Sequence, residues 1–562
     1  MRGSGTAMDK MVQAVKGLTV NEAEDQIVIA LDFGTTFSGI AYAFAKGGKP
    51  DLVSVMDWPG TSFKQPKIPT VICYDPDNKD GFTWGAQKHK TKAVAGVKLL
   101  LDPDQPRPLY LPESTAKVDI KRLGKPAVDV AADYIEAIYK HALEKIEGKV
   151  PAEYLRICQK QFVLSVPAVW SDKAKDTTLK AAKKAGIHPI TLIKEPEAAA
   201  LYTLHTMVDR SLTVGDALVI CDAGGGMAGS LGLNQRFVQA VKELVGEDAY
   251  YHLRKTKGFE LATKQFDQSI KTSFRGDPDE DYYVNFPMAD LEDDPFNGLQ
   301  SNTWNMKVDD VKVIFDPLIS DIERLVSEQV NLVRVKRMQE RHAKENEIKA
   351  IFLVGGFGAS EYLKIRLEKI HPDIQIIQPH DAWSAIAKGA VLSCLPQKAV
   401  IVSTQATKHY GVSARPPYDN KIDKGQWKVY DSSTGVYRTD RMTWYIHQGE
   451  DLKRNQTLRF GFYYRLPSSY SPSDLIFTNK LLQSENNIAP IHPSPNSTKT
   501  NCILTTDLRD INKSCLKRVM GLDRKEYWDL DYDLVVSIND AVMKFSFEIE
   551  GKEMGAVEAS YD

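Results

Sequence analysis

One local pattern occurs twice in this chain and restricts its fold more than any other feature. An apolar run ends in an aspartate, and a glycine follows two positions later. "VIALDFGTT" contains Asp32 and Gly34, and "LVICDAGGG" contains Asp222 and Gly224. Because glycine has no Cβ, an anion can approach the backbone N–H groups of such a turn. A single loop of this kind can be an ordinary turn capped by its aspartate. Two of them predict two similar lobes that close on one phosphate-containing ligand.

Further features of the same kind accompany the two loops. Thr35 and Thr36 follow the first glycine and offer hydroxyl donors, and the chain then returns as a second strand. The sequence lacks the lysine and the helix that follow the glycines of a Walker P-loop. A third apolar run, "IFLVGGFGAS", ends in Gly355 and Gly356 before a helix predicted to start near Ser360.

The order of apolar runs predicts the fold class. Short apolar runs alternate with helix-period segments from about residue 27 to residue 397, which predicts an α/β architecture. Beyond that point β-rich runs are separated by turn residues, which predicts a β-sandwich. We therefore predict a disordered leader over 1–25, a first lobe over 26–215, a second lobe over 216–398 with an acidic surface insertion at about 276–303, and a β-rich domain over 399–562.

Composition narrows the classes of partner. The net charge of −2 favours neither nucleic acid nor an anionic membrane as the main partner, and we expect neither. No apolar run reaches the roughly 20 residues that span a bilayer. The 6 cysteines are scattered without metal-ligand spacing, which favours a reducing compartment. We expect a cytoplasmic monomer.

Longer stretches resemble a known family. "FVLSVPAVW", "KEPEAAALY" and the glycine loops resemble the 70-kDa heat-shock protein (DnaK-type) family of the actin-like ATPase superfamily. "WGAQKHK" and "SLGLNQRF" are similar to a divergent, lid-less group of this family found in animals and fungi. The resemblance implies two duplicated, ribonuclease-H-like lobes that bind ATP or ADP with Mg²⁺. It also implies that the C-terminal β domain takes unfolded peptide or client protein as its partner.

The resemblance also implies roles for individual residues. Asp32 and Asp222 would face each other and hold Mg²⁺ through water, since this hard cation prefers oxygen ligands. Glu195 would order the hydration shell of the metal or the attacking water, or it is only a helix N-terminal acid. Lys88 would contact the γ-phosphate, or it is a solvated surface lysine. The remaining implied nucleotide contacts are Gly34, Thr35, Thr36, Gly224, Gly225, Gly226, Lys271, Gly355 and Gly356.

The second loop departs from the family pattern. Met227 stands where the family has threonine, Gly229 stands where it has a second aspartate, and the returning strand is absent. Methionine has no donor for a phosphate. Phosphoryl transfer depends on positioning, so we expect hydrolysis to be impaired. The returning strand would belong to a β-hairpin in the family pattern. Loss of this hairpin predicts a truncated second sheet with an unpaired edge.

Three functions remain open at this point. The first is a heat-shock-70-like ATP-binding protein, related to chaperones, with weak or impaired hydrolysis. The second is a non-enzymatic pseudo-ATPase scaffold. The third is a small-molecule kinase of the same superfamily, which the β domain and the "KEPEAAA" stretch disfavour.

Overall fold

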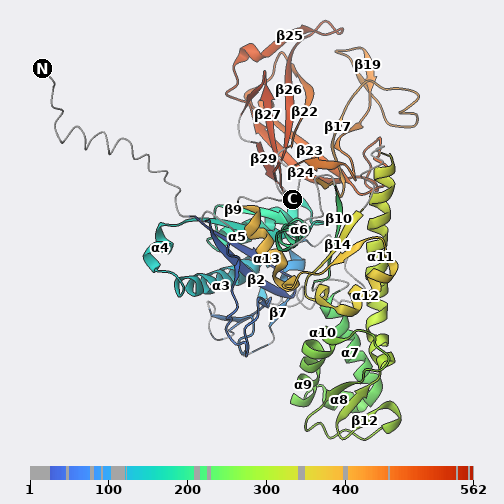
Figure 1. Cartoon of the computed structure of the whole chain (residues 1–562). Coiled ribbons are helices and arrows are strands. Elements are labelled where there is room, and N and C mark those ends of the chain that lie inside the picture. Colours follow the sequence, from blue (N-terminus) through green and yellow to red (C-terminus); the bar gives the residue numbers. More distant parts are fainter. Residues whose placement is uncertain are drawn as a thin grey trace, which may run out of the picture.

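The computed structural model describes residues 26–45, 50–75, 77, 81–89, 91, 93–102, 121, 123–207, 216–224, 229–339, 348–395, 403–453, 456–539, 542–554 and 557–560. The predicted leader and residues Gly225, Gly226 and Met227 of the second loop lie outside the described residues. The described part forms two α/β lobes and a β-rich domain (Figure 1). This arrangement confirms the fold class predicted from the sequence.

The first lobe is built on a six-stranded sheet with the order β3-β2-β1-β8-β9, in which β4 also pairs with β2. Strand β1 runs antiparallel to β2 and parallel to β8. The strands of this sheet are β1 (Gln26–Asp32), β2 (Phe37–Ala45), β3 (Val53–Ser54), β4 (Ile68–Pro69), β8 (Gln159–Val166) and β9 (Ile190–Lys194). Beside it lie β5 (Val71–Tyr74), β6 (Phe82–Trp84), β7 (Val94–Ala95), η1 (Val97–Leu100), α3 (Ala127–Glu147), α4 (Ala152–Ile157), α5 (Asp172–Lys184) and α6 (Glu195–Thr206).

Strand β1 is buried on both faces, as its unbroken apolar sequence predicts. Successive side chains of a strand point to opposite faces. Ile27 and Ile29 therefore join the core that α3 and α5 cover. Val28 and Ala30 point to the other face, where they pack against α6 and α13 (Ala385–Ser393).

The second lobe has a smaller sheet. Strands β10 (Ala217–Asp222), β14 (Ile348–Val354) and β15 (Gln375–Ile377) form three parallel strands in this order. Helix α7 (Ser230–Val245) follows β10 closely, and β14 is the only described strand that pairs with β10. The equivalent position in the first lobe, beside β1, is filled by β2. Strand β10 is therefore an edge strand among the described elements.

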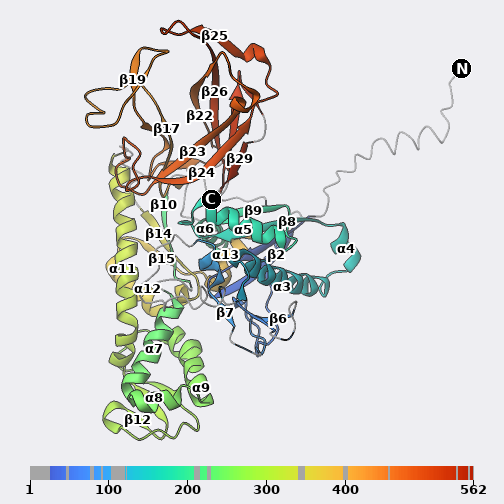
Figure 2. The same ribbon diagram turned by 180° about the vertical axis from the view of Figure 1, so that it is seen from behind.

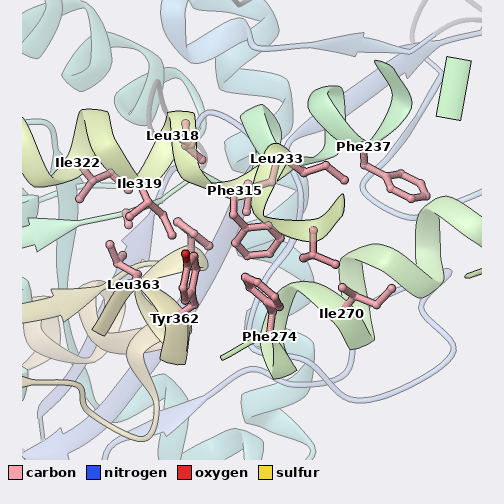
Figure 3. Packing of buried hydrophobic residues seen from close by; sticks show 14 of the residues in the cluster. Leu233, Phe237, Ile270, Phe274, Phe315, Leu318, Ile319, Ile322, Tyr362 and Leu363 are labelled. Carbon is pink, nitrogen blue, oxygen red and sulfur yellow. The ribbon is translucent and has the colours of Figure 1, made fainter. Parts of the chain in front are cut away.

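The lower part of the second lobe is mainly helical. Phe237 stacks on Phe266 with 4.3 Å between ring centroids, and Phe274 packs on Phe315 at 4.9 Å. Figure 3 shows this cluster reaching Tyr362. The helices involved are α7, α8 (Glu247–Leu253), α9 (Lys257–Gln265), η2 (Phe266–Ile270), α10 (Lys271–Ser273), α11 (Val308–Gln339) and α12 (Glu361–Ile370).

The prediction of a surface insertion at about 276–303 is wrong in one respect. Strands β11 (Tyr282–Asn285), β12 (Leu299–Gln300) and β13 (Thr303–Met306) form an antiparallel sheet there. Val284 and Phe286 are fully buried in the core of the lobe, while most of the acids are exposed. The segment is therefore a folded part of the lobe with an acidic outer face.

Helices α6 and α13 cross between the lobes. Helix α6 follows the first-lobe sheet but contacts β10 of the second lobe, and α13 packs back on β1 and β2 of the first. A Cβ atom on Gly389 would lie 1.7 Å from the carbonyl oxygen of Ala198, so the two helix backbones touch at this point. Only glycine fits such a contact.

The C-terminal domain is a sandwich of two five-stranded sheets. Leu481 and Leu504 of one sheet share a core with Leu534 and Phe547 of the other. One sheet has the order β20-β17-β23-β24-β29, and the other has β22-β26-β27-β28 with β25 on β26. Their strands are β17 (His409–Ala414), β20 (Arg441–Ile446), β22 (Gln456–Pro467), β23 (Ile476–Ser484), β24 (Lys499–Asp507), β25 (Leu516–Met520), β26 (Glu526–Asn539), β27 (Val542–Ile549), β28 (Lys552–Glu553) and β29 (Val557–Ser560). The domain also contains two separate two-stranded sheets. One pairs β16 (Ser403–Gln405) with β21 (Asp451–Lys453), and the other pairs β18 (Val429–Asp431) with β19 (Val436–Arg438).

The sandwich contacts both lobes (Figure 1 and Figure 2). Asn501 Nδ2 of β24 donates to Asp172 Oδ2 of α5 at 3.0 Å, and this pair is buried. Lys336 Nζ of α11 lies 2.6 Å from Asp451 Oδ1. None of the helices that the structure describes is both long and apolar enough to cross a membrane.

Candidate functional site

Asp32 lies at the carboxyl end of β1 and is almost completely buried. Lys67 Nζ donates to its Oδ2 at 2.6 Å, and Ser165 Oγ donates to its Oδ1 at 2.9 Å. Burial alone would raise the pKa of Asp32, but the ammonium groups of Lys67 and Lys98 and the two hydrogen bonds outweigh it and lower the pKa. Asp32 is therefore a fixed negative charge at neutral pH.

The loop after Asp32 has the geometry of a tight turn. A Cβ on Gly34 would lie 2.0 Å from the carbonyl oxygen of Phe37, so this position requires glycine. The Thr36 carbonyl accepts a bond from the Thr70 N–H at 2.7 Å, which ties the loop to β4. Within the part of the chain that the structure describes, the hydroxyls of Thr35 and Thr36 have no hydrogen-bond partner. Both are available to a ligand.

A second ion pair lies at the start of α6. Glu195 is the first residue of this helix, and its Oε1 lies 2.7 Å from Lys98 Nζ. Lys98 is 4% exposed, and its ammonium lies 5.4 Å from the ring centroid of Trp170. A lysine this deeply buried is uncommon unless it is paired, and Glu195 is its partner.

Asp222 lies at the end of β10 in the second lobe and faces this cluster. Solvent reaches its side chain, but protein atoms crowd around the carboxyl group. This desolvation, with the negative charges of Glu195 and Asp32, raises the pKa of Asp222 from its ordinary value of 3.8 to about 7. Lys67 and Lys98 act in the opposite direction and do not cancel the effect. The two loop aspartates and Glu195 thus converge from both lobes.

The glycine pair after β14 packs directly against the second loop. Gly355 has a φ of 86°, and a Cβ there would lie 2.6 Å from Asp222 Oδ1. Ala223 is held between the Val354 carbonyl and the Phe357 N–H, at 2.9 and 2.8 Å. Gly356 lies beside the Trp383 indole, whose ring makes an edge contact with Phe37 of the first lobe at 5.6 Å between centroids. The three glycine-containing junctions therefore surround one site.

Two sequence-predicted lysines have no described contact with Asp32, Glu195 or Asp222. Lys88 is exposed, and the structure describes no contact between it and the three acids. The geometry favours Lys67 and Lys98 for the role predicted for Lys88. Lys271 is buried and pairs with Asp267, and its Nζ lies 3.3 Å from Asn234 Oδ1.

The sequence reasoning missed Lys67, Lys98 and Ser165. A signal existed for Lys98, because it stands inside the apolar run "GVKLLLD", where a lysine is expected to be buried and paired. Lys67 directly precedes the short strand β4. Ser165 stands in the buried strand β8, where a hydroxyl needs a partner.

The contacts of Asp32 disfavour direct coordination of a magnesium ion. Both carboxylate oxygens already accept short bonds, from a buried ammonium and a buried hydroxyl. A cation that coordinated Asp32 Oδ2 directly would compete with Lys67 for that oxygen. The described residues also contain no group of three or more His, Cys, Asp or Glu side chains that could hold a metal ion.

Comparisons with known proteins agree with this geometry. The model of the family described as "Hsp70 protein" matches residues 109–229, which include Glu195 and Asp222. Human heat shock 70 kDa protein 12A is 24% identical over 71% of this chain and 74% of its own length. Human heat shock 70 kDa protein 12B is 22% identical over 66% of this chain and 69% of its own length. Chaperone protein HscA of Proteus mirabilis (strain HI4320) is 25% identical over 37% of this chain and 33% of its own length. With its two lobes and paired aspartate loops, the chain is a divergent Hsp70-like protein with an actin-like ATPase fold.

Proposed function

We propose that this protein binds ATP or ADP between its two lobes. One observation carries the proposal: Asp32, Glu195 and Asp222 converge from both lobes, with two buried lysines, beside three glycine-containing turns. The unpaired hydroxyls of Thr35 and Thr36 and the close packing of Gly355 support the same ligand. Backbone N–H groups, hydroxyls and ammonium groups together suit a polyphosphate.

We further propose that hydrolysis is weak. Phosphoryl transfer needs the donors on both sides of the γ-phosphate to be positioned together. In the first lobe, Thr35 and Thr36 stand on a loop between two paired strands. In the second lobe, Met227 replaces the expected donor, and β10 has a strand on one side only among the described elements. Among the described strands, the strand that leads to the second loop is therefore supported on one side only.

A titration tests nucleotide binding. The full chain is titrated calorimetrically with ATP and with ADP, and its melting temperature is followed in parallel, since a ligand that binds only the native state raises it. The double variant Thr35→Val and Thr36→Val removes two hydroxyls with little change of shape and is expected to weaken binding about tenfold or more. Thr272→Val, on the exposed face of α10, serves as the control and should bind as the wild type does.

The pseudo-ATPase scaffold is the second candidate. It is favoured by β10, which pairs with only one strand among those that the structure describes. If the folded chain shows neither heat of binding nor thermal stabilisation with any adenine nucleotide, the scaffold replaces nucleotide binding. A chaperone role, with client peptides on the β domain, and a cytoplasmic location are also proposals that the family resemblance supports.

A further inference from the structure

We propose that this site binds the phosphates of its nucleotide without Mg²⁺, and that the ammonium groups of Lys67 and Lys98 supply the positive charge instead. This inference rests on the proposed nucleotide binding and concerns the chemistry of the same site. It starts from the way in which the acidic residues are already paired.

Asp32 and Lys67 form a buried ion pair at the first acidic position of the site. Asp32 is 2% exposed and Lys67 is 7% exposed, and their charged atoms lie 2.6 Å apart. Two charges removed from water are stable only when they remain paired and hydrogen-bonded. Ser165 takes the other carboxylate oxygen. A metal ion bound directly to Asp32 Oδ2 would therefore take that oxygen from a buried ammonium group, which opposes direct coordination.

The Glu195–Lys98 pair repeats this arrangement at the second acidic position. Lys98 Nζ lies 2.7 Å from Glu195 Oε1, and the lysine is buried against Trp170. Because Glu195 begins α6, the pair is anchored to the helix that crosses between the lobes. Both lysines act electrostatically on Asp222 across the site. Both belong to the first lobe, where each is held by an acid of the candidate site.

Each ammonium group can serve a carboxylate and a phosphate at once. An ammonium group has three N–H donors. In the described residues, Lys67 and Lys98 each donate to one carboxylate, and no other acceptor of either group is described. Two donors on each lysine remain for phosphate oxygens. Phosphate binding then keeps both ion pairs, whereas direct metal coordination at Asp32 Oδ2 competes with one.

The neighbouring loop supplies donors that also need no metal. The backbone N–H groups of Thr35 and Thr36 have no acceptor among the described residues, and neither do their hydroxyls. Consecutive free N–H groups in a glycine turn form an anion-binding concavity. The loop and the two lysines thus provide a cationic and hydrogen-bonding surface made entirely of this chain.

The experiment is a calorimetric titration of the full chain with ATP, once in excess MgCl₂ and once in EDTA. We expect dissociation constants that agree within about threefold in the two buffers. Lys67→Met should weaken binding about tenfold or more in both, because a charge-assisted bond to phosphate is lost. Lys140→Met, on the exposed face of α3, is the matched control and should leave both constants unchanged.

Each other outcome has a distinct meaning. Binding in MgCl₂ that disappears in EDTA overturns the inference but leaves the proposed function standing. No binding by the folded wild type in either buffer overturns the proposed function, and this inference with it. Should Lys67→Met fail to fold, the double variant Asp32→Asn and Lys67→Met removes both charges of the pair. Full-strength ATP binding by that folded double variant in EDTA would overturn the role of Lys67.

Discussion

The carboxyl group of Asp222 makes the stability of this protein depend on pH. Its pKa is raised from 3.8 to about 7, so between these values the native state holds a proton that the unfolded state has lost. The free energy of unfolding therefore falls as pH rises through this range. We predict that the melting temperature of Asp222→Asn falls less between pH 5 and pH 8 than that of the wild type. Asp309→Asn, whose side chain is 95% exposed, should behave as the wild type does. Parallel curves for all three proteins would contradict the assignment.

Gly355 can be tested by adding a single carbon atom. Its φ of 86° is unfavourable for alanine, and the new Cβ would lie 2.6 Å from Asp222 Oδ1 and 2.7 Å from the backbone of Ala223. Gly246→Ala is a matched control, because Gly246 has a φ of 81° with no atom within 4 Å of the added carbon. We expect both variants to lose stability in denaturant titrations, with Gly355→Ala losing about 1–3 kcal/mol more. Equal losses would mean that the second loop simply moves away.

At the scale of secondary-structure elements, the two lobes differ in how their central strand is held. Strand β1 pairs with β2 and β8, whereas β10 pairs with β14 alone among the described strands. Backbone amides on an unpaired edge are open to solvent. We predict that hydrogen–deuterium exchange followed by mass spectrometry gives peptides of β10 faster exchange than peptides of β1. Equal protection of the two strands would indicate that another part of the chain covers the β10 edge.

The sequence predicts the secondary-structure elements better than it predicts the contacts between them. The short apolar runs of β1, β8, β10 and β14 predict strands, and the structure confirms all four. The 276–303 segment was misread because its many acids outweighed the alternation of Tyr282, Val284 and Phe286. In that alternation the period of two, and not the composition, indicated a strand with one buried face.

The site itself was predictable only in part. The two aspartate loops can be recognised from a few neighbouring residues, since each needs its own glycine. The partners of the acids do not, because Lys67 reaches Asp32 across 35 positions and Lys98 reaches Glu195 across 97. Such pairings depend on the three-dimensional fold, so local sequence patterns cannot indicate them.

At the scale of the whole molecule, the β-sandwich is fastened to the first lobe by a buried hydrogen bond. Asn501 donates to Asp172, which also accepts a bond from Lys175 at 2.9 Å. We predict that Asp172→Ala and Asn501→Ala are coupled by about 1 kcal/mol in a double-mutant cycle of unfolding free energies. Asp172→Ala combined with Lys517→Met, whose side chain is 67% exposed, should be additive. Additivity of the first pair as well would show that the bond does not stabilise domain docking.

The contact between Gly389 and Ala198 determines how the lobes can move. Its two helices come from different lobes and touch backbone to backbone, so the distance between them at this point cannot shrink. Sliding one helix along the other would drive neighbouring side chains of α13 into α6, because packed helices interlock through their side-chain ridges. Rotation about the contact requires no such overlap. The crossing therefore sets the separation of α6 and α13 at this point, and a side chain at position 389 would force the two helices apart.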